Sequence, residues 1–217
     1  MVEVVPLPAT LLPAVGEVFA GSHADYPPFR HLFPDPARRA AVLRTFFTAT
    51  VRDALAFGAV DAAVGDGDRL LGVAVWLPPG AFPWSTRRKL RSTPAMLKVA
   101  RAAPGSFRGF MRLGANAERH HPRDRHWNLE TMGIAPAAQG QGVGSRLITP
   151  GLARADLQRL PCYLTTAKGA NVGFYRRFGF EVEAEGLPLV PGGPTHWGMR
   201  RPVPDPARPG TTGQGGA

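Results

Sequence analysis

The chain has 217 residues and a mass of 23.2 kDa, and 44% of its residues are hydrophobic, which favours one ordinary domain and excludes a fully disordered chain. No run of about 18 apolar residues occurs, which excludes a transmembrane helix, and the single cysteine, Cys162, excludes an intrachain disulfide and a cysteine-based zinc site. The net charge of +10 suits a nucleic-acid or phosphate partner, but its arginines are spread along the chain, which favours compositional bias as its origin.

The two ends of the sequence carry separate expectations. The first twenty residues lack a cationic stretch followed by an apolar block, and Pro6, Pro8 and Pro13 interrupt them, so no secretory signal is expected. A single cysteine agrees with a reducing, cytoplasmic location. Residues 202–217 are rich in Pro, Gly and Thr and contain almost no large apolar residue. We therefore expect a domain of residues 1–201 followed by a disordered tail.

Apolar periodicity predicts strands and helices in the N-terminal half. We expect a strand at residues 2–7, a helix at 11–19, and a longer helix that starts at the N-cap Asp35 with Pro36 and stops at Gly58. The Gly-Asp-Gly-Asp sequence at residues 65–68 predicts a hairpin of strands 59–64 and 70–77. Residues 85–119 have a helical pattern that is broken near Pro104.

The C-terminal half continues this alternation. The expected elements are a strand at 126–134, a helix at about 142–160, a strand at 161–166, a helix at 171–178, and strands at 180–185 and 197–200. Together these elements indicate an α/β or α+β domain with a mixed sheet. Trp76 and Trp84 are expected in the core or in a pocket wall, and Cys162 in a short buried strand is expected to be inert.

A glycine-rich turn connects the strand at 126–134 to the next helix. Its residues are Gln139, Gly140, Gln141, Gly142, Val143, Gly144 and Ser145. Amides at a helix start have no internal acceptor, and glycines allow a close approach of the backbone, so the turn suits a pyrophosphate. Its spacing matches neither a P-loop nor a dinucleotide fingerprint. Taken alone, the turn is equally compatible with a tight connection that binds no ligand.

The turn belongs to a longer pattern that resembles the GNAT superfamily of N-acetyltransferases. The order is a strand, Gln-x-x-Gly-x-Gly, a helix, a short strand, Asn-x-x-x-Tyr and Gly-Phe, found here at Gln139, Gly142, Gly144, Asn171, Tyr175, Gly179 and Phe180. The resemblance covers about residues 1–201 and is strongest from 127 onwards. The chain is similar, more closely, to the puromycin N-acetyltransferase type, through segments such as Ala24-Asp25-Tyr26-Pro27, Pro150-Gly151 and Trp197-x-Met199-x-Arg201.

This resemblance implies a GNAT fold with acetyl-CoA as cosubstrate and no metal. The fold would be a mixed sheet of about seven strands, flanked by helices, splayed at the acetyl-CoA site, with a helical insertion before the cofactor-binding strand. Met132, Gly133 and Ile134 on that strand would offer backbone groups to the pantetheine arm, and the amides of residues 139–145 would hold the pyrophosphate. Asn171 would bond the arm or nearby backbone, or cap a helix.

Some charged residues have less specific roles. Arg146, and less strongly Lys168, are candidates for the phosphates of CoA. The cluster of His120, His121, Asp124 and His126 is not expected to bind a metal, because adjacent histidines on a charged loop usually point apart.

The resemblance also implies two catalytic residues for attack of an amine on a thioester. Tyr175 would protonate the departing thiolate, and Glu130 would take the proton of the amine directly or through water. Strand alternation places Glu130 and Met132 on one face. A backbone amide near Ile134 would polarise the thioester carbonyl.

One position departs from the puromycin type. Relatives of that type tend to carry Leu-Glu-Thr-Ser where this chain has Leu164-Thr165-Thr166-Ala167, and a threonine cannot act as a base near pH 7. If relatives use that glutamate, this chain must rely on Glu130, a water or an already neutral amine, and activity on puromycin itself is in doubt. A loop histidine such as His126 is a further candidate for the base.

The acceptor is predicted only by class. Tyr26 and Phe29 would stack on an aromatic or apolar acceptor or pack the first helix. The sequence thus predicts acetyl transfer to a primary amine of a small molecule, antibiotic- or nucleoside-like, by a monomer or homodimer without nucleic-acid or membrane partners. The alternatives are acetylation of a protein N-terminus or lysine, and a noncatalytic acyl-CoA-binding regulatory module. The arginine-rich helices are expected to be a solvated face that covers the acceptor site.

Overall fold

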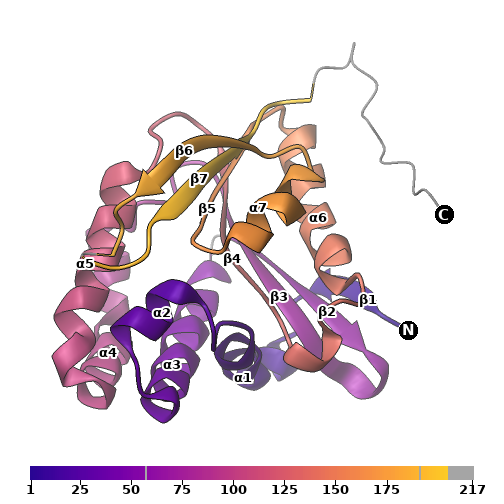
Figure 1. Ribbon diagram of the computed structural model, residues 1–217. Helices are drawn as coiled ribbons and strands as arrows, with labels where there is room; N and C mark the ends of the chain where they lie inside the picture. Colours follow the sequence, from indigo (N-terminus) through magenta and orange to yellow (C-terminus); the bar gives the residue numbers. More distant parts are fainter. Residues whose placement is uncertain (57, 191, 205–217) are drawn as a thin grey trace.

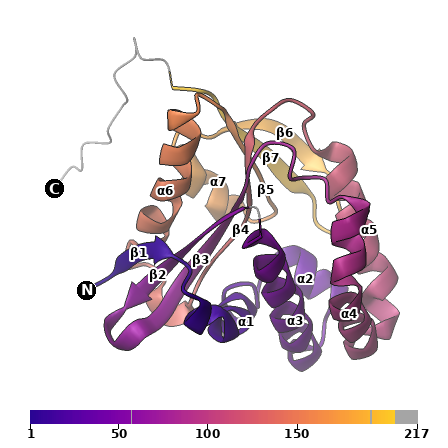
Figure 2. The ribbon, with the colours of Figure 1, turned by 180° about the vertical axis from the view of Figure 1, so that it is seen from behind.

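A mixed sheet organises the chain, and its helices lie on both faces (Figures 1 and 2). The computed structural model describes residues 1–56, 58–190 and 192–204. Within them the sheet has seven strands in the order β1-β2-β3-β4-β5-β7-β6. The strands are β1 (Glu3–Pro6), β2 (Ala59–Gly65), β3 (Arg69–Leu77), β4 (Trp127–Ile134), β5 (Cys162–Thr166), β6 (Glu181–Leu187) and β7 (His196–Arg201). All neighbouring strands are antiparallel except β4 and β5, which are parallel.

The helices divide between the two faces of the sheet. In the described residues they are α1 (Leu12–Ser22), α2 (Pro27–Leu32), α3 (Pro36–Ala54), α4 (Thr86–Ala102), α5 (Pro104–His120), α6 (Val143–Leu157) and α7 (Gly169–Arg176). One apolar core joins the sheet to α1–α5, and a second core joins it to α6 and α7. The predicted fold class, a mixed sheet flanked by helices with a helical insertion before β4, is confirmed.

Local signals in the sequence account for most of the element boundaries. The Asp35 side chain accepts a hydrogen bond from the Arg38 amide at 2.7 Å, so it caps α3 as predicted, and Pro36 occupies the first helical position. Pro104 separates α4 from α5, also as predicted. The sequence analysis missed α2, because Pro27 and Pro28 suggest a loop. The two prolines instead occupy the first positions of this short helix, where an amide hydrogen has no intrahelical partner.

Helix α6 lies close to the sheet because of one glycine. A Cβ atom on Gly151 would lie 2.0 Å from Cε2 of Trp76, so only glycine lets the helix cover this indole. Trp76 is fully buried, which confirms its predicted place in the core. Burial also raises the pKa of the Cys162 thiol to about 12, in agreement with an inert cysteine.

The parallel strands β4 and β5 separate after a short contact. They pair only at Trp127 with Cys162 and at Asn128 with Tyr163. The rest of β4, as far as Ile134, is paired with β3 but not with β5, and the strands diverge in Figure 1. This opening is the predicted splay, and it exposes backbone groups along one edge of β4.

A bulge changes the side-chain alternation within β4. Trp76 pairs with Leu129 and Val75 with Thr131, so Glu130 is the additional residue. Met132 pairs with Ala74 and packs against the core beneath α6, whereas Glu130 interacts with charged groups on α3, α4 and α5. The prediction that alternation places Glu130 and Met132 on one face is therefore wrong.

Two further expectations concern the ends of the chain and membranes. Most of the predicted tail, residues 205–217, lies outside the described residues. None of the helices in the described part combines the length and apolar character needed to cross a membrane.

Candidate functional site

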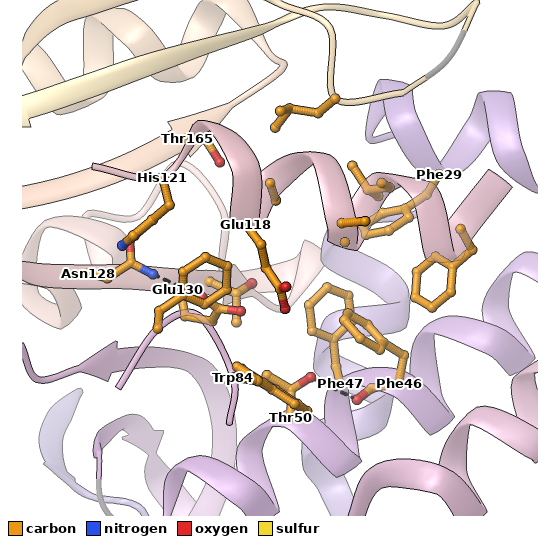
Figure 3. A pocket seen from close by; sticks show the side chains of 18 of the residues that line it. Phe29, Phe46, Phe47, Thr50, Trp84, Glu118, His121, Asn128, Glu130 and Thr165 are labelled. Carbon is orange, nitrogen blue, oxygen red and sulfur yellow. Dashed lines mark hydrogen bonds between the residues drawn. The ribbon is translucent and has the colours of Figure 1, made fainter. Parts of the chain in front are cut away.

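Two cavities meet where β4 and β5 separate. One, of about 580 Å³, runs between the glycine-rich turn and α7, and we call it the groove. The other, of about 600 Å³, is bounded mainly by α2–α5, β4 and β5, and we call it the chamber (Figure 3). Five residues belong to the walls of both cavities, and we call them the junction: His23, Tyr26, Met132, Asn171 and Tyr175. A ligand in the groove can therefore reach a ligand in the chamber.

The groove brings together most of the residues predicted to bind a cofactor. Those that line it are Met132, Ile134, Gln139, Gly140, Gly142, Val143, Gly144, Ser145, Asn171 and Tyr175. Gly133 and Gln141 do not line it. Helix α1 packs over Gly133, where a Cβ atom would lie 2.6 Å from Ser22 Oγ. The Gln141 side chain instead donates a hydrogen bond to the Ala137 carbonyl at 2.8 Å.

The backbone of the turn is shaped to receive an anion. Gly140 and Gly142 both have φ of +76°, and a Cβ atom on either would meet no other atom within 4 Å. Gly142 is the N-cap of the 15-residue helix α6, so the first-turn amides of α6 begin at the groove wall. These features fit a phosphate group.

Of the two cations expected at the groove, one lies there and one does not. Lys168 and Arg177 line it. Arg146, the favoured candidate from the sequence, does not, and its guanidinium donates to the Val2 carbonyl at 3.3 Å. Arg146 is close to the turn in sequence, but its side chain is directed to Val2, next to β1.

Asn171 and Tyr26 both bind the end of β5. Asn171 Nδ2 donates to Thr166 Oγ1 at 3.1 Å, and the Ala167 amide donates to the Tyr26 hydroxyl at 2.7 Å. Lys168 is the N-cap of α7, so the alternative that Asn171 caps a helix is wrong. Tyr26 and Phe29, the predicted acceptor residues, both line the chamber, and Tyr26 reaches it as part of the junction.

Tyr175 lies at the junction and keeps its proton. Its side chain is buried, and burial raises the pKa of its phenol above the ordinary value of 10. The phenol is therefore a hydrogen-bond donor at any physiological pH. Tyr175 lines both the groove and the chamber.

Glu130 lies in the chamber wall, with its carboxylate held by a neighbour on the same strand. Asn128 Nδ2 donates to Glu130 Oε2 at 2.9 Å. Burial raises the pKa of Glu130 to about 7, although the positive charge of Arg88 acts in the opposite direction. Arg88 donates from Nη2 to Asp53 Oδ2 at 2.7 Å in a buried ion pair. Glu130 can thus exchange a proton near neutral pH.

Histidines near the cavities are electrically neutral at pH 7. His23, which the sequence analysis did not single out, lies at the junction beside Ser22, and burial lowers its pKa to about 4. His121 lines the chamber, and its pKa is also lowered to about 4 by burial. His126 does not line the chamber and instead lies 2.9 Å from His121 through their Nε2 atoms. Across the described residues, no group of three or more His, Cys, Asp or Glu could hold a metal.

Comparisons with known proteins agree with this architecture. Residues 97–182 match the model of a family described as an acetyltransferase (GNAT) domain. An uncharacterised N-acetyltransferase of Schizosaccharomyces pombe is 31% identical over 123 residues, which are 54% of this chain and 49% of the relative. The chain thus spans about half the length of this curated relative.

Solved structures share the fold. One from Corynebacterium glutamicum, described as histone acetyltransferase HPA2 and related acetyltransferase, has a TM-score of 0.71 at 24% identity and covers 95% of this chain and 99% of its own. The PaiA N-acetyltransferase of Thermoplasma acidophilum, solved in complex with coenzyme A, has a TM-score of 0.57 at 13% identity, with 94% and 99% covered. At these identities the likeness concerns the fold.

Proposed function

Because residues 97–182 match the model of a GNAT acetyltransferase domain, we propose that the chain is an acetyl-CoA-dependent N-acetyltransferase that acts on the primary amine of a small molecule by direct attack. The observation that carries this proposal is the meeting of two cavities of different character at Tyr175. The groove has a phosphate-suited turn, and the chamber has a carboxylate of near-neutral pKa. Direct transfer needs two ligands that meet at one point, and this site offers a compartment to each.

The groove residues fit acetyl-CoA, which would supply the acetyl group as an activated thioester. The amides at the start of α6, with Lys168 and Arg177, would hold its phosphates. The unpaired edge of β4 near Ile134 would bind the pantetheine arm as an added strand would, through backbone groups.

Glu130 is the best-suited base in the described site. An amine must lose a proton to attack a carbonyl, and a base works best when its pKa is close to the working pH. The pKa of Glu130 is about 7, whereas that of His23 is about 4, too low for a proton to remain there. Glu118, the other carboxylate in the chamber wall, is paired with Lys89 Nζ at 2.7 Å. Glu130 therefore takes the proton of the attacking amine.

Tyr175 is suited to give a proton to the leaving sulfur as the new C–N bond forms and the C–S bond breaks. Its pKa is raised by burial, which by itself makes the phenol a weaker acid. Burial also raises the pKa of a thiol, as it does for Cys162 elsewhere in the core, so a thiolate formed at the buried junction would be a correspondingly stronger base. Burial therefore raises the pKa of the phenol and of the leaving thiol together, so proton transfer from Tyr175 to the sulfur stays matched.

The chamber favours a small molecule over the alternative acceptors. Its volume of about 600 Å³ falls within the range of small-ligand sites, roughly 300–1,000 Å³. A noncatalytic acyl-CoA-binding module would need no carboxylate of near-neutral pKa beside the junction. We also propose that the protein is of the puromycin N-acetyltransferase type, that it is cytoplasmic, and that it is a monomer or a homodimer. These proposals rest on the features described in the sequence analysis.

Calorimetric titration with acetyl-CoA tests the proposal directly. The Gly140→Val variant should lose most acetyl-CoA affinity, because valine disfavours φ of +76° and adds a side chain at the phosphate turn. Gly67→Val is the matched control, since Gly67 has φ of +67° and equally open surroundings in the β2–β3 turn. Absence of acetyl-CoA binding to the unmodified chain would reject the proposal, and equal losses in both variants would reject the assigned role of the turn.

A further inference from the structure

The wall of the chamber is mainly aromatic and aliphatic. Aromatic rings enter from α2, α3, α5 and the segment before α4, and they include Phe29, Phe46, Phe47, Trp84, Phe107 and Phe110. Figure 3 shows Phe46, Phe47 and Trp84 around the same space into which Glu118 and Glu130 point. Such a surface binds an apolar or aromatic body, because burial of that body releases water from both surfaces.

Helix α5 leaves room in the chamber through three small residues, Gly114, Ala115 and Ala117. Its lining positions are 107, 110, 111, 113, 114, 115, 117 and 118, which together form one broad inward face. Gly114 and Ala117 lie at the middle of that face, and a Cβ atom on Gly114 would meet no other atom within 4 Å. A larger residue at position 114 would therefore extend into the chamber.

The charges in the wall favour a cation and disfavour an anion. Among the described lining residues, the charged side chains are Lys89, Glu118 and Glu130, and Lys89 is paired with Glu118. The lining histidines are neutral at pH 7, since burial lowers the pKa of His23, His121 and His196 to about 4. Among these lining groups Glu130 is the remaining charge, and it becomes ionised as the pH rises through about 7.

We infer that the acceptor is a primary amine attached to an aromatic or bulky apolar body without an anionic group, and that Gly114 sets the size of that body. This inference rests on the proposed function. The ammonium form of the amine is attracted by Glu130, which then removes its proton, and the rings of α3 and α5 bury the body. An added carboxylate would lie in the chamber without a free cation, and a polyamine would bury unpaired charges against the rings.

A release assay for CoA with a matched set of amines tests the acceptor class. The set is tryptamine, 2-phenylethylamine, phenylalanine, spermidine and an N-terminal alanine peptide. We expect kcat/KM to be at least about 100-fold higher for the two aromatic amines than for phenylalanine, which differs from 2-phenylethylamine by its carboxylate. Calorimetry with acetyl-CoA is run on the same preparation.

The outcomes separate this inference from the proposed function. If acetyl-CoA binds but phenylalanine, spermidine or the peptide is acetylated as efficiently as the aromatic amines, the inference is overturned and the proposed function stands. Failure to acetylate either aromatic amine, with acetyl-CoA bound, also overturns it. If acetyl-CoA does not bind, the proposed function itself fails.

The Gly114→Leu variant tests the size determinant. Leucine favours a helix, so the fold should persist, and we expect kcat/KM for tryptamine to fall about tenfold or more, by a larger factor than that for n-propylamine. Gly105→Leu is the matched control, because Gly105 also lies in α5 with open space around a Cβ atom but does not line the chamber. An equal loss for both amines, or no loss in Gly114→Leu, would contradict the role of this residue.

Discussion

Replacement of Glu130 by glutamine should lower activity and raise stability at alkaline pH. Glutamine has nearly the same shape, and its amide oxygen can still accept the hydrogen bond from Asn128 Nδ2. Loss of a general base lowers kcat by about 10²–10⁴-fold. In the unmodified protein, kcat/KM should rise with pH through about 7 as Glu130 loses its proton, and this limb should vanish in the variant.

The effect on stability follows from the same pKa. In the unfolded chain Glu130 ionises near its ordinary value of 4.5, and in the folded chain near 7. Below about pH 4.5 both states hold the proton, so its ionisation has no effect there. Between the two values only the unfolded state loses the proton, so the folded state loses stability as pH rises. Above pH 7 the accumulated loss is at most about 3 kcal/mol, from 1.36 kcal/mol per pKa unit.

Glutamine cannot ionise, so Glu130→Gln should avoid this loss. Urea denaturation at pH 4.5 and pH 8 should give equal stabilities at the lower pH and a more stable variant, by up to about 3 kcal/mol, at the higher pH. Glu17→Gln is the control, because the exposed Glu17 does not line the chamber and pairs with Arg44. The reasoning is refuted if the variant keeps the full rate, or if its stability relative to the parent is independent of pH.

Three further substitutions test other parts of the structure. Tyr175→Phe should lower kcat by about 100-fold or more with calorimetric acetyl-CoA affinity unchanged, and an unchanged kcat would remove the assigned acid role. Asp53→Asn should cost about 3–5 kcal/mol in urea denaturation because it leaves the buried Arg88 guanidinium without its carboxylate, and a loss below 1 kcal/mol would contradict this role of the pair. Gly151→Ala should cost about 1–3 kcal/mol or more, because its methyl group overlaps Trp76, and a neutral result would show that α6 moves freely.

Local chemistry explains what could be predicted about the fold. The Asp35 cap, the break at Pro104 and the turn at residues 65–68 each depend on residues adjacent in sequence, and all three are present in the structure. The periodicity of the apolar residues placed the strands and the larger helices for the same reason. The short helix α2 was missed because its two prolines are compatible with both a loop and a first helical turn.

The candidate site was predicted only where a motif fixes the backbone. Gly140 and Gly142 adopt positive φ in the turn, and Tyr175, which the resemblance singled out, lines both cavities. The face of β4 on which Glu130 lies could not be predicted from the sequence. It depends on a bulge in β4 that has no local signature and arises from pairing with β3. His23 had no sequence signal that would separate it from an ordinary helix-terminal residue.

By itself, therefore, the sequence determined the order of the elements, the phosphate-suited turn and the identity of two catalytic candidates. Only the tertiary structure decided which side chains share a space. It placed Arg177 at the groove with the expected Lys168, in place of Arg146, and it brought Glu130 and the rings of α3 and α5 into the wall of one chamber. The physical reason is that backbone conformation depends on neighbours in the chain, whereas charge, burial and pKa depend on groups that only packing brings together.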